Sequence, residues 1–125
     1  MTGSKNESDG FFGSRSAFLF PGQGAQEVGM GRDVYEKCPA ARQIFAEVEQ
    51  ALGTPLTQLM FEGPAQELER TINSQPAILT VSLACLAAAR EHAASAIDSR
   101  VYFMAGHSLG EYTALAAAGV LDVAE

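Results

Sequence analysis

The sequence predicts an α/β fold with a parallel sheet, flanking helices and a serine on a sharp turn between a strand and a helix. Two short, unbroken apolar runs, Ala17–Phe20 and Val101–Gly106, are the candidate strands. Runs of this kind are typical of strands buried in a parallel sheet. The third observation is the sequence Gly-His-Ser-Leu-Gly, residues 106–110, which begins where the second run ends.

Composition limits the classes of function. The chain has 125 residues, is 47% hydrophobic and carries a net charge of −7 with only eight Lys and Arg. These values fit one globular domain, or a piece of one, and argue against nucleic acid as a partner, because phosphate contacts need local cations. The most apolar run, Ala77–Ala89, is about 13 residues long, against roughly 20 needed to span a bilayer. It is therefore expected to be a buried helix rather than a membrane segment.

The first 16 residues are polar and rich in glycine, and they lack the apolar core of a signal peptide and the acid-poor composition of a transit peptide. We expect residues 1–16 to be a disordered leader, residues 17–125 to be the folded part, and the protein to be cytoplasmic. Cys38 and Cys85 show no metal-ligand spacing and are interpreted as reduced structural residues.

The first strand is followed by the loop "PGQGAQEVGMG", residues 21–31. Its four glycines remove Cβ atoms where the backbone bends sharply or closely approaches another group. The loop is therefore expected to present backbone N–H groups to a ligand. The alternative is a flexible surface turn.

Helical patterns fill the middle of the chain. Apolar residues at three- and four-residue steps predict an amphipathic helix over Pro39–Leu52 that ends at Gly53. Thr54 and Pro55 look like the N-cap and first-turn proline of a short helix ending near Gly63, and "AQELERT", residues 65–71, suggests another. Pro76 is expected to begin the long helix "PAILTVSLACLAAAREHAA", residues 76–94. Its apolar residues occur all round the helix, so it is expected to be buried on several sides.

The turn at residues 106–110 has the pattern of a nucleophile elbow. Gly106 and Gly110 avoid collisions between strand and helix, and the helix that starts after Ser108 and is closed by Gly119 offers free N–H groups to a developing oxyanion. The alternative role for Ser108 is a helix cap.

Three motifs together resemble the amino-terminal part of malonyl-CoA:acyl carrier protein transacylases and the acyltransferase domains of fatty acid and polyketide synthases. They are "FPGQGAQEVGMG", "NSQPAILT" and "AGHSLGEYTALAAAG". The resemblance implies part of a hydrolase-like large subdomain and a reaction that needs no cofactor and no metal. It also implies transfer of malonyl from malonyl-CoA to the phosphopantetheine thiol of acyl carrier protein, in fatty acid or polyketide biosynthesis, through an ester on Ser108.

The resemblance also implies roles for other residues. The backbone N–H groups of Gln23 and Leu109 would form the oxyanion hole, and Gln75 would line the substrate site, although a polar residue at a helix entry without a ligand role is an alternative. His107 is expected to act structurally at the elbow with Gly106 and Gly110, because side chains adjacent on such a turn point apart.

The sequence departs from the family in three respects. It contains neither the downstream histidine base nor the arginine that pairs with the malonyl carboxylate, and its only histidines are His92 and His107. The small ferredoxin-like subdomain is absent as well. We therefore expect a truncated chain that is inactive by itself. Two alternatives remain: a serine esterase of the α/β-hydrolase type, and a non-catalytic remnant that binds acyl carrier protein.

Overall fold

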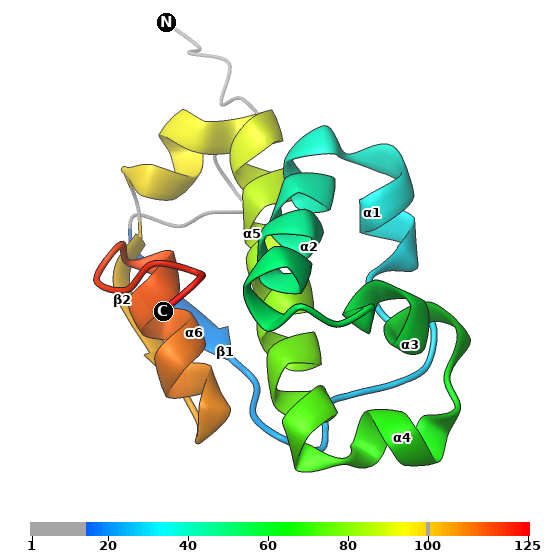
Figure 1. The fold of residues 1–125 in the computed structure, drawn as a ribbon. Helices are drawn as coiled ribbons and strands as arrows, with labels where there is room; N and C mark the ends of the chain where they lie inside the picture. The colour runs from blue at the N-terminus through cyan, green and yellow to red at the C-terminus, as the bar shows by residue number, and fades with distance from the viewer. Residues whose placement is uncertain (1–14, 100) are drawn as a thin grey trace, which may run out of the picture.

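The structure, a computed structural model, describes residues 15–99 and 101–125. They form two strands and six helices in the order β1, α1 to α5, β2, α6 (Figure 1). Residues 1–14 of the expected leader lie outside the described residues, and Ser16 already belongs to β1. A partial α/β fold with a small parallel sheet and flanking helices is therefore present, as the sequence predicts.

The sheet consists of β1 (Ser16–Phe20) and β2 (Val101–Gly106), which pair in parallel. Phe18 lies opposite Met104, and Phe20 lies opposite Gly106. Burial alternates along β1, because successive side chains of a strand point to opposite faces. Phe20 is buried against α5 and α6, whereas Leu19 is 78% exposed on the other face.

Helix α2 (Pro39–Leu52) has the predicted bounds and buries Ala41, Phe45 and Val48. It ends at Gly53, whose φ of 67° is the left-handed conformation that glycine adopts without strain. The helix before it, α1 (Arg32–Lys37), was not predicted from the sequence. Its six residues are too few for a clear helical period.

Two short helices follow, α3 (Leu56–Glu62) and α4 (Ala65–Glu69), as expected. The expected N-cap at Thr54 is wrong, because Pro55 occupies the N-cap position and no side chain caps the helix there. Instead, the Glu49 carboxylate of α2 accepts a hydrogen bond from the Thr57 backbone N–H at 2.7 Å. A neighbouring helix thus supplies the acceptor that was expected from the loop.

The long helix α5 (Thr71–Asp98) begins five residues earlier than expected, so Pro76 lies inside it. A proline within a helix cannot donate to the carbonyl four residues before it. Here that carbonyl belongs to Ile72, a residue that is 73% exposed, so the proline lies near an end of the helix that is open to solvent. A break at Ala93, with φ −148° and ψ 38°, coincides with the expected end of the helix.

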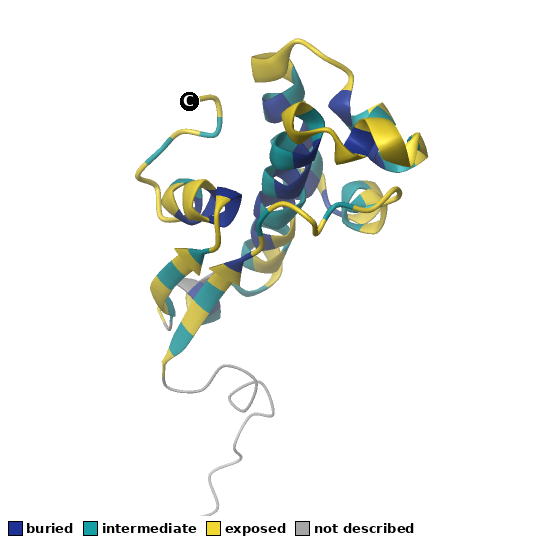
Figure 2. Ribbon diagram, turned by 90° about the horizontal axis from the view of Figure 1, so that it is seen from below, coloured by how far each residue is buried: buried dark blue, intermediate teal, exposed yellow. Residues whose placement is uncertain are grey.

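Helix α5 joins the two halves of the molecule. Between α2, α3 and α5 lies a core that includes Phe45, Met60 and Ala77, and a second core between α5, α6 and the sheet includes Phe20 and Leu83. Figure 2 shows buried positions along α5 and alternating exposure along β1. By length and composition, Thr71–Ala93 could cross a membrane, in contrast to the shorter apolar run expected from the sequence. In this fold the helix packs against α2 and α6 as a central element.

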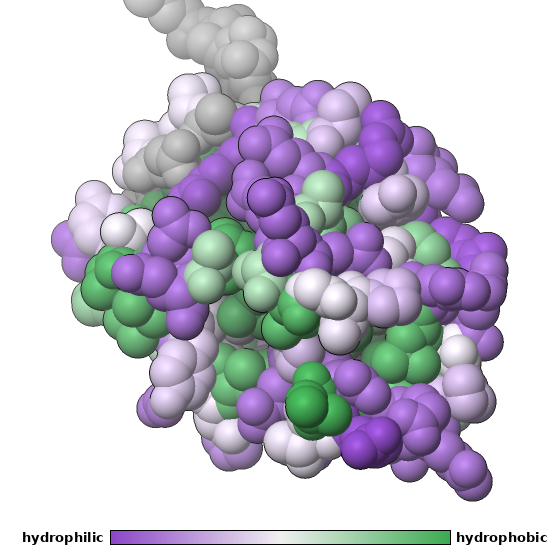
Figure 3. Space-filling view, viewed as in Figure 1, coloured by the Kyte–Doolittle hydropathy of each residue, from purple (hydrophilic) through white to green (hydrophobic). Residues whose placement is uncertain are grey.

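The surface is mostly polar over α1 and α2, and apolar patches lie beside β2 and over α3 (Figure 3). Phe103 on β2 is 73% exposed there, and Tyr112 on α6 is 60% exposed.

Candidate active site

Ser108 occupies a strained turn between β2 and α6 (Leu109–Ala117). Its φ is 54° and its ψ is −117°, and among the described residues it is the only one other than glycine with a positive φ. The turn is closed by hydrogen bonds from the Gly110 N–H to the His107 carbonyl at 2.9 Å and from the Glu111 N–H to the Ser108 carbonyl at 3.0 Å. Strained backbone of this kind is concentrated at functional sites.

Three glycines allow this turn to pack without space for side chains. A Cβ on Gly106 would lie 1.9 Å from the backbone of Gly110, and a Cβ on Gly110 would lie 2.1 Å from the Phe20 carbonyl oxygen. A Cβ on Gly22 would lie 2.5 Å from the His107 carbonyl oxygen. The loop after β1 therefore lies directly against the turn that carries Ser108.

Gln23 follows Gly22 in this loop. Its side-chain amide donates a hydrogen bond to the Thr71 hydroxyl at the start of α5, at 3.1 Å. Within residues 15–99 and 101–125, neither the backbone N–H of Gln23 nor that of Leu109 donates a hydrogen bond. Both donors are thus free for a ligand, and Leu109 is the first residue of α6, where the helix dipole favours negative charge.

A cavity of about 710 Å³ lies between the first turns of α5, helix α6 and the segment 121–125. Ser108, Leu109 and Gln75 line it together, although Gln75 is 33 positions from Ser108 along the chain. Gln23 and His107 are not among the lining residues. The others are Pro76, Leu79, Glu111, Tyr112, Ala116, Leu121, Asp122, Val123 and Glu125.

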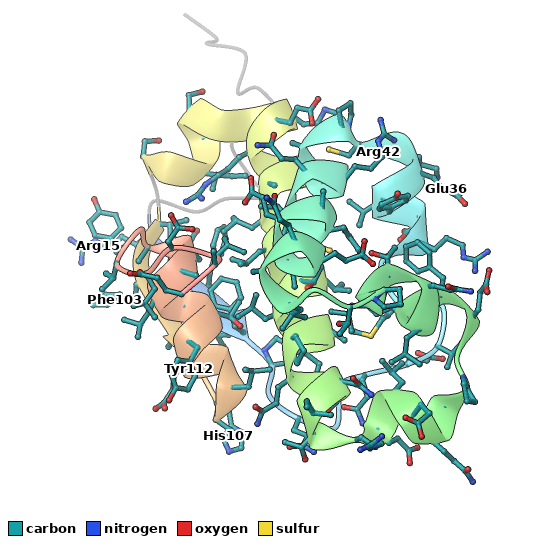
Figure 4. The ribbon with its side chains drawn as sticks, viewed as in Figure 1. Arg15, Glu36, Arg42, Phe103, His107 and Tyr112 are labelled. Carbon is teal, nitrogen blue, oxygen red and sulfur yellow. The ribbon has the colours of Figure 1, made fainter. Side chains whose placement is uncertain are left out.

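The charged residues that line the cavity are Glu111, Asp122 and Glu125, and no histidine, lysine or arginine of the described chain is among them. His107 is exposed and directly follows β2, at the start of α6 (Figure 4). Its backbone takes part in the turn, since its N–H donates to the Phe20 carbonyl at 3.3 Å. His92 is exposed near the far end of α5.

The cysteines are both free thiols, one buried and one exposed. Cys38 donates to the Glu91 carboxylate at 2.7 Å, and this hydrogen bond holds the pKa of Glu91 below its ordinary value. Cys85 is the exposed cysteine, but neighbouring atoms partly shield its thiol from water. This partial desolvation, with a smaller contribution from Asp33, raises the pKa of the Cys85 thiol. No group of three or more His, Cys, Asp or Glu side chains suited to a metal ion occurs in the described part of the chain.

Sequence reasoning missed Thr71 and the acidic lining of the cavity. Thr71 and Gln75 are four residues apart in one helix, so they share a face. That signal was available, but it was hidden by the expectation that the helix starts at Pro76. The residues near the end of the chain carry no pattern that places them beside Ser108.

The sequence of residues 17–125 matches the protein-family model for the acyl transferase domain. The chain belongs to the acyl transferase domain family. Among its relatives, the malonyl CoA-acyl carrier protein transacylase of Bacillus subtilis strain 168 is 53% identical over 109 residues, which are 87% of this chain and 33% of that protein. The resemblance noted from the three motifs is thereby confirmed.

Solved structures of acyl transferases show the same fold. The acyl-carrier-protein S-malonyltransferase of Bartonella henselae superposes with a TM-score of 0.82 at 46% identity, covering 88% of this chain and 35% of that one. A malonyl-transacylase in complex with a type II polyketide synthase acyl carrier protein superposes with a TM-score of 0.80 at 42% identity, covering 89% and 35%. The chain spans about a third of the length of the relatives that it matches.

Proposed function

We propose that Ser108 is the nucleophile of an acyl transfer reaction, and that the acyl group is attached to its hydroxyl as an ester. The observation that carries the proposal is the strained φ of Ser108 at the start of α6, facing a cavity of about 710 Å³. In the reaction, the serine oxygen attacks a thioester carbonyl, the thiol of coenzyme A leaves with the serine proton, and a second thiol later takes the acyl group.

The oxyanion formed in each step is stabilised by the N–H groups of Gln23 and Leu109. Two observations support this role: both N–H groups are free, and Gly22 brings the loop of Gln23 against the backbone of His107 and Ser108. Gln75 binds the acyl chain or thioester from the opposite wall, since it lines the same cavity as Ser108. Gly106, Gly110 and the backbone of His107 maintain the turn.

The proposed donor is malonyl-CoA and the proposed acceptor is acyl carrier protein, as the names of the similar proteins indicate. The acidic lining of the cavity opposes a malonyl carboxylate by like-charge repulsion. A cation to pair with that carboxylate would therefore be supplied by another group, in agreement with the arginine that the family resemblance implies. The histidine that the resemblance implies as the base is likewise not in this sequence. The reaction requires no cofactor, because both the nucleophile and the thioester are supplied without one.

The same reasoning extends to organisation and location. We propose that residues 17–125 form the amino-terminal part of the large subdomain of the acyl transferase, and that the protein acts in the cytoplasm. Comparing limited proteolysis of this chain with that of the Bacillus subtilis transacylase would test the domain boundary.

The test of the proposed reaction is single-turnover acylation. Because the chain is expected to be inactive by itself, it is joined to the part of the Bacillus subtilis transacylase that follows the matched region, and this fusion is incubated with excess malonyl-CoA. Peptide mass spectrometry then locates the malonyl group. We expect the group on Ser108, its later transfer to the thiol of added acyl carrier protein, and no acylation of Ser108→Ala. The matched control is Ser82→Ala, because Ser82 is a half-buried serine on α5. Acylation at another residue contradicts the proposal, and hydrolysis of a simple ester without reaction of malonyl-CoA favours an esterase.

A further inference from the structure

We infer that Thr71 is a positioning residue for the oxyanion hole, because its hydroxyl anchors the Gln23 side chain and thereby holds the Gln23 backbone N–H toward Ser108. The inference rests on the proposed function of Ser108 and Gln23. It adds a residue that belongs to none of the three motifs as quoted above and lies 48 positions from Gln23.

Few other hydrogen bonds restrain the loop around Gln23. Gly22 and Gly24 flank it and have no side chains, and Gly24 has a φ of 108°. The hydrogen bonds from Ala25 to the Gly22 carbonyl and from Gly24 to the Gln26 side chain lie within the loop. Among the residues that the structure describes, the Gln23–Thr71 hydrogen bond at 3.1 Å is the only one that joins residues 22–26 to a helix or strand.

Thr71 is exposed, but it belongs to a helix whose next residues are packed into the fold. Thr71 is the first residue of α5, and the next turn of this helix buries Ser74, Ala77 and Ile78. Gln75 lies one turn after Thr71 and lines the cavity. The same rigid turn of helix therefore orients the oxyanion loop and one wall of the cavity. A preorganised donor accelerates a reaction because it needs no reorganisation when charge develops.

The chemistry of the Gln23–Thr71 hydrogen bond indicates which variants of Thr71 separate loss of the bond from a change in side-chain shape. A threonine hydroxyl both donates and accepts, so it can hold either end of the Gln23 amide. Valine keeps the shape of threonine and removes the hydroxyl, whereas serine keeps the hydroxyl. No side-chain cap is lost at position 71, because the N-cap of α5 is Arg70 and no side-chain hydrogen bond caps that end.

The experiment uses the fusion to the Bacillus subtilis transacylase described above and measures single-turnover acylation of Ser108 by malonyl-CoA, together with hydrogen–deuterium exchange of residues 22–26. For Thr71→Val we expect acylation to slow by about 2- to 10-fold, the effect of one exposed hydrogen bond, and exchange in the loop to become faster. Thr71→Ser should remain within about 2-fold of the wild-type rate. Thr54→Val, at an exposed threonine with no recorded side-chain hydrogen bond in the described chain, is the matched control.

A double-mutant cycle distinguishes positioning from a general structural effect. In a Gln23→Ala background, which keeps the backbone N–H, Thr71→Val should cause no further slowing. Equal slowing in both backgrounds, or unchanged loop exchange in Thr71→Val, would overturn the inference. If the fusion with the wild-type sequence is not acylated at Ser108, the proposed function fails and the catalytic part of this inference fails with it. A failure of the inference alone leaves wild-type acylation intact.

Discussion

Replacing Gly106 by alanine tests the packing of the turn that carries Ser108. The new Cβ would lie 1.9 Å from both the carbonyl carbon and the carbonyl oxygen of Gly110, and 2.5 Å from the Glu111 nitrogen. These are backbone atoms of the first turn of α6, so no side-chain rotation relieves the clash. Strand β2 and helix α6 must move apart, which separates Ser108 from the loop at Gly22.

The magnitude follows from what the clash displaces. Extra methyl or methylene groups in a well-packed site cost typically 1–3 kcal/mol, and contact with backbone places Gly106→Ala at about 3 kcal/mol or more. That is a large share of the 5–15 kcal/mol by which domains are stable. With a shift of about 4 °C per kcal/mol for a chain of this size, the melting temperature should fall by about 12 °C or more.

Gly119→Ala is the matched control, because a Cβ there meets nothing within 4 Å but the φ of 76° disfavours alanine. The conformational cost alone is about 1 kcal/mol, which gives a fall of about 4 °C. Melting of both variants is followed by far-UV circular dichroism. A Gly106→Ala variant that melts within about 2 °C of the wild type would refute the packing argument.

Three further predictions follow from single residues. Ser108→Gly should raise the melting temperature by about 4 °C, since glycine adopts a positive φ without strain, and should abolish acylation; a lower melting temperature would show that the serine conformation is not strained. Because the pKa of Glu91 is lowered, its hydrogen bond with Cys38 stabilises the fold at pH values above 4.5, the ordinary pKa of glutamate. This stabilisation is lost as the pH falls through the lowered pKa, so Glu91→Gln should flatten the acid side of a curve of stability against pH. Iodoacetamide at pH 8 should alkylate exposed Cys85 before buried Cys38, as peptide mass spectrometry would show. Because the pKa of Cys85 is raised, its alkylation should be slower than that of the amino acid cysteine in solution.

The sequence alone was enough to predict both strands, the bounds of α2 and the turn at Ser108. Each of these depends on interactions between near neighbours: a glycine at a left-handed position ends α2, and glycines two residues either side of Ser108 permit the turn. Local rules of this kind are readable from spacing, because the residues that obey them are close together along the chain.

Tertiary contacts decided the rest. Helix α5 starts at Thr71 rather than Pro76, and its first turn buries Ser74 against the fold. Ile72, whose carbonyl loses its donor at Pro76, is an exposed residue of that turn. The bond between Gln23 and Thr71 and the meeting of Gln75 with Ser108 in one cavity join segments that are tens of residues apart. No periodicity records such meetings. They arise when burial of the apolar faces of α5 and α6 brings distant segments of the chain together.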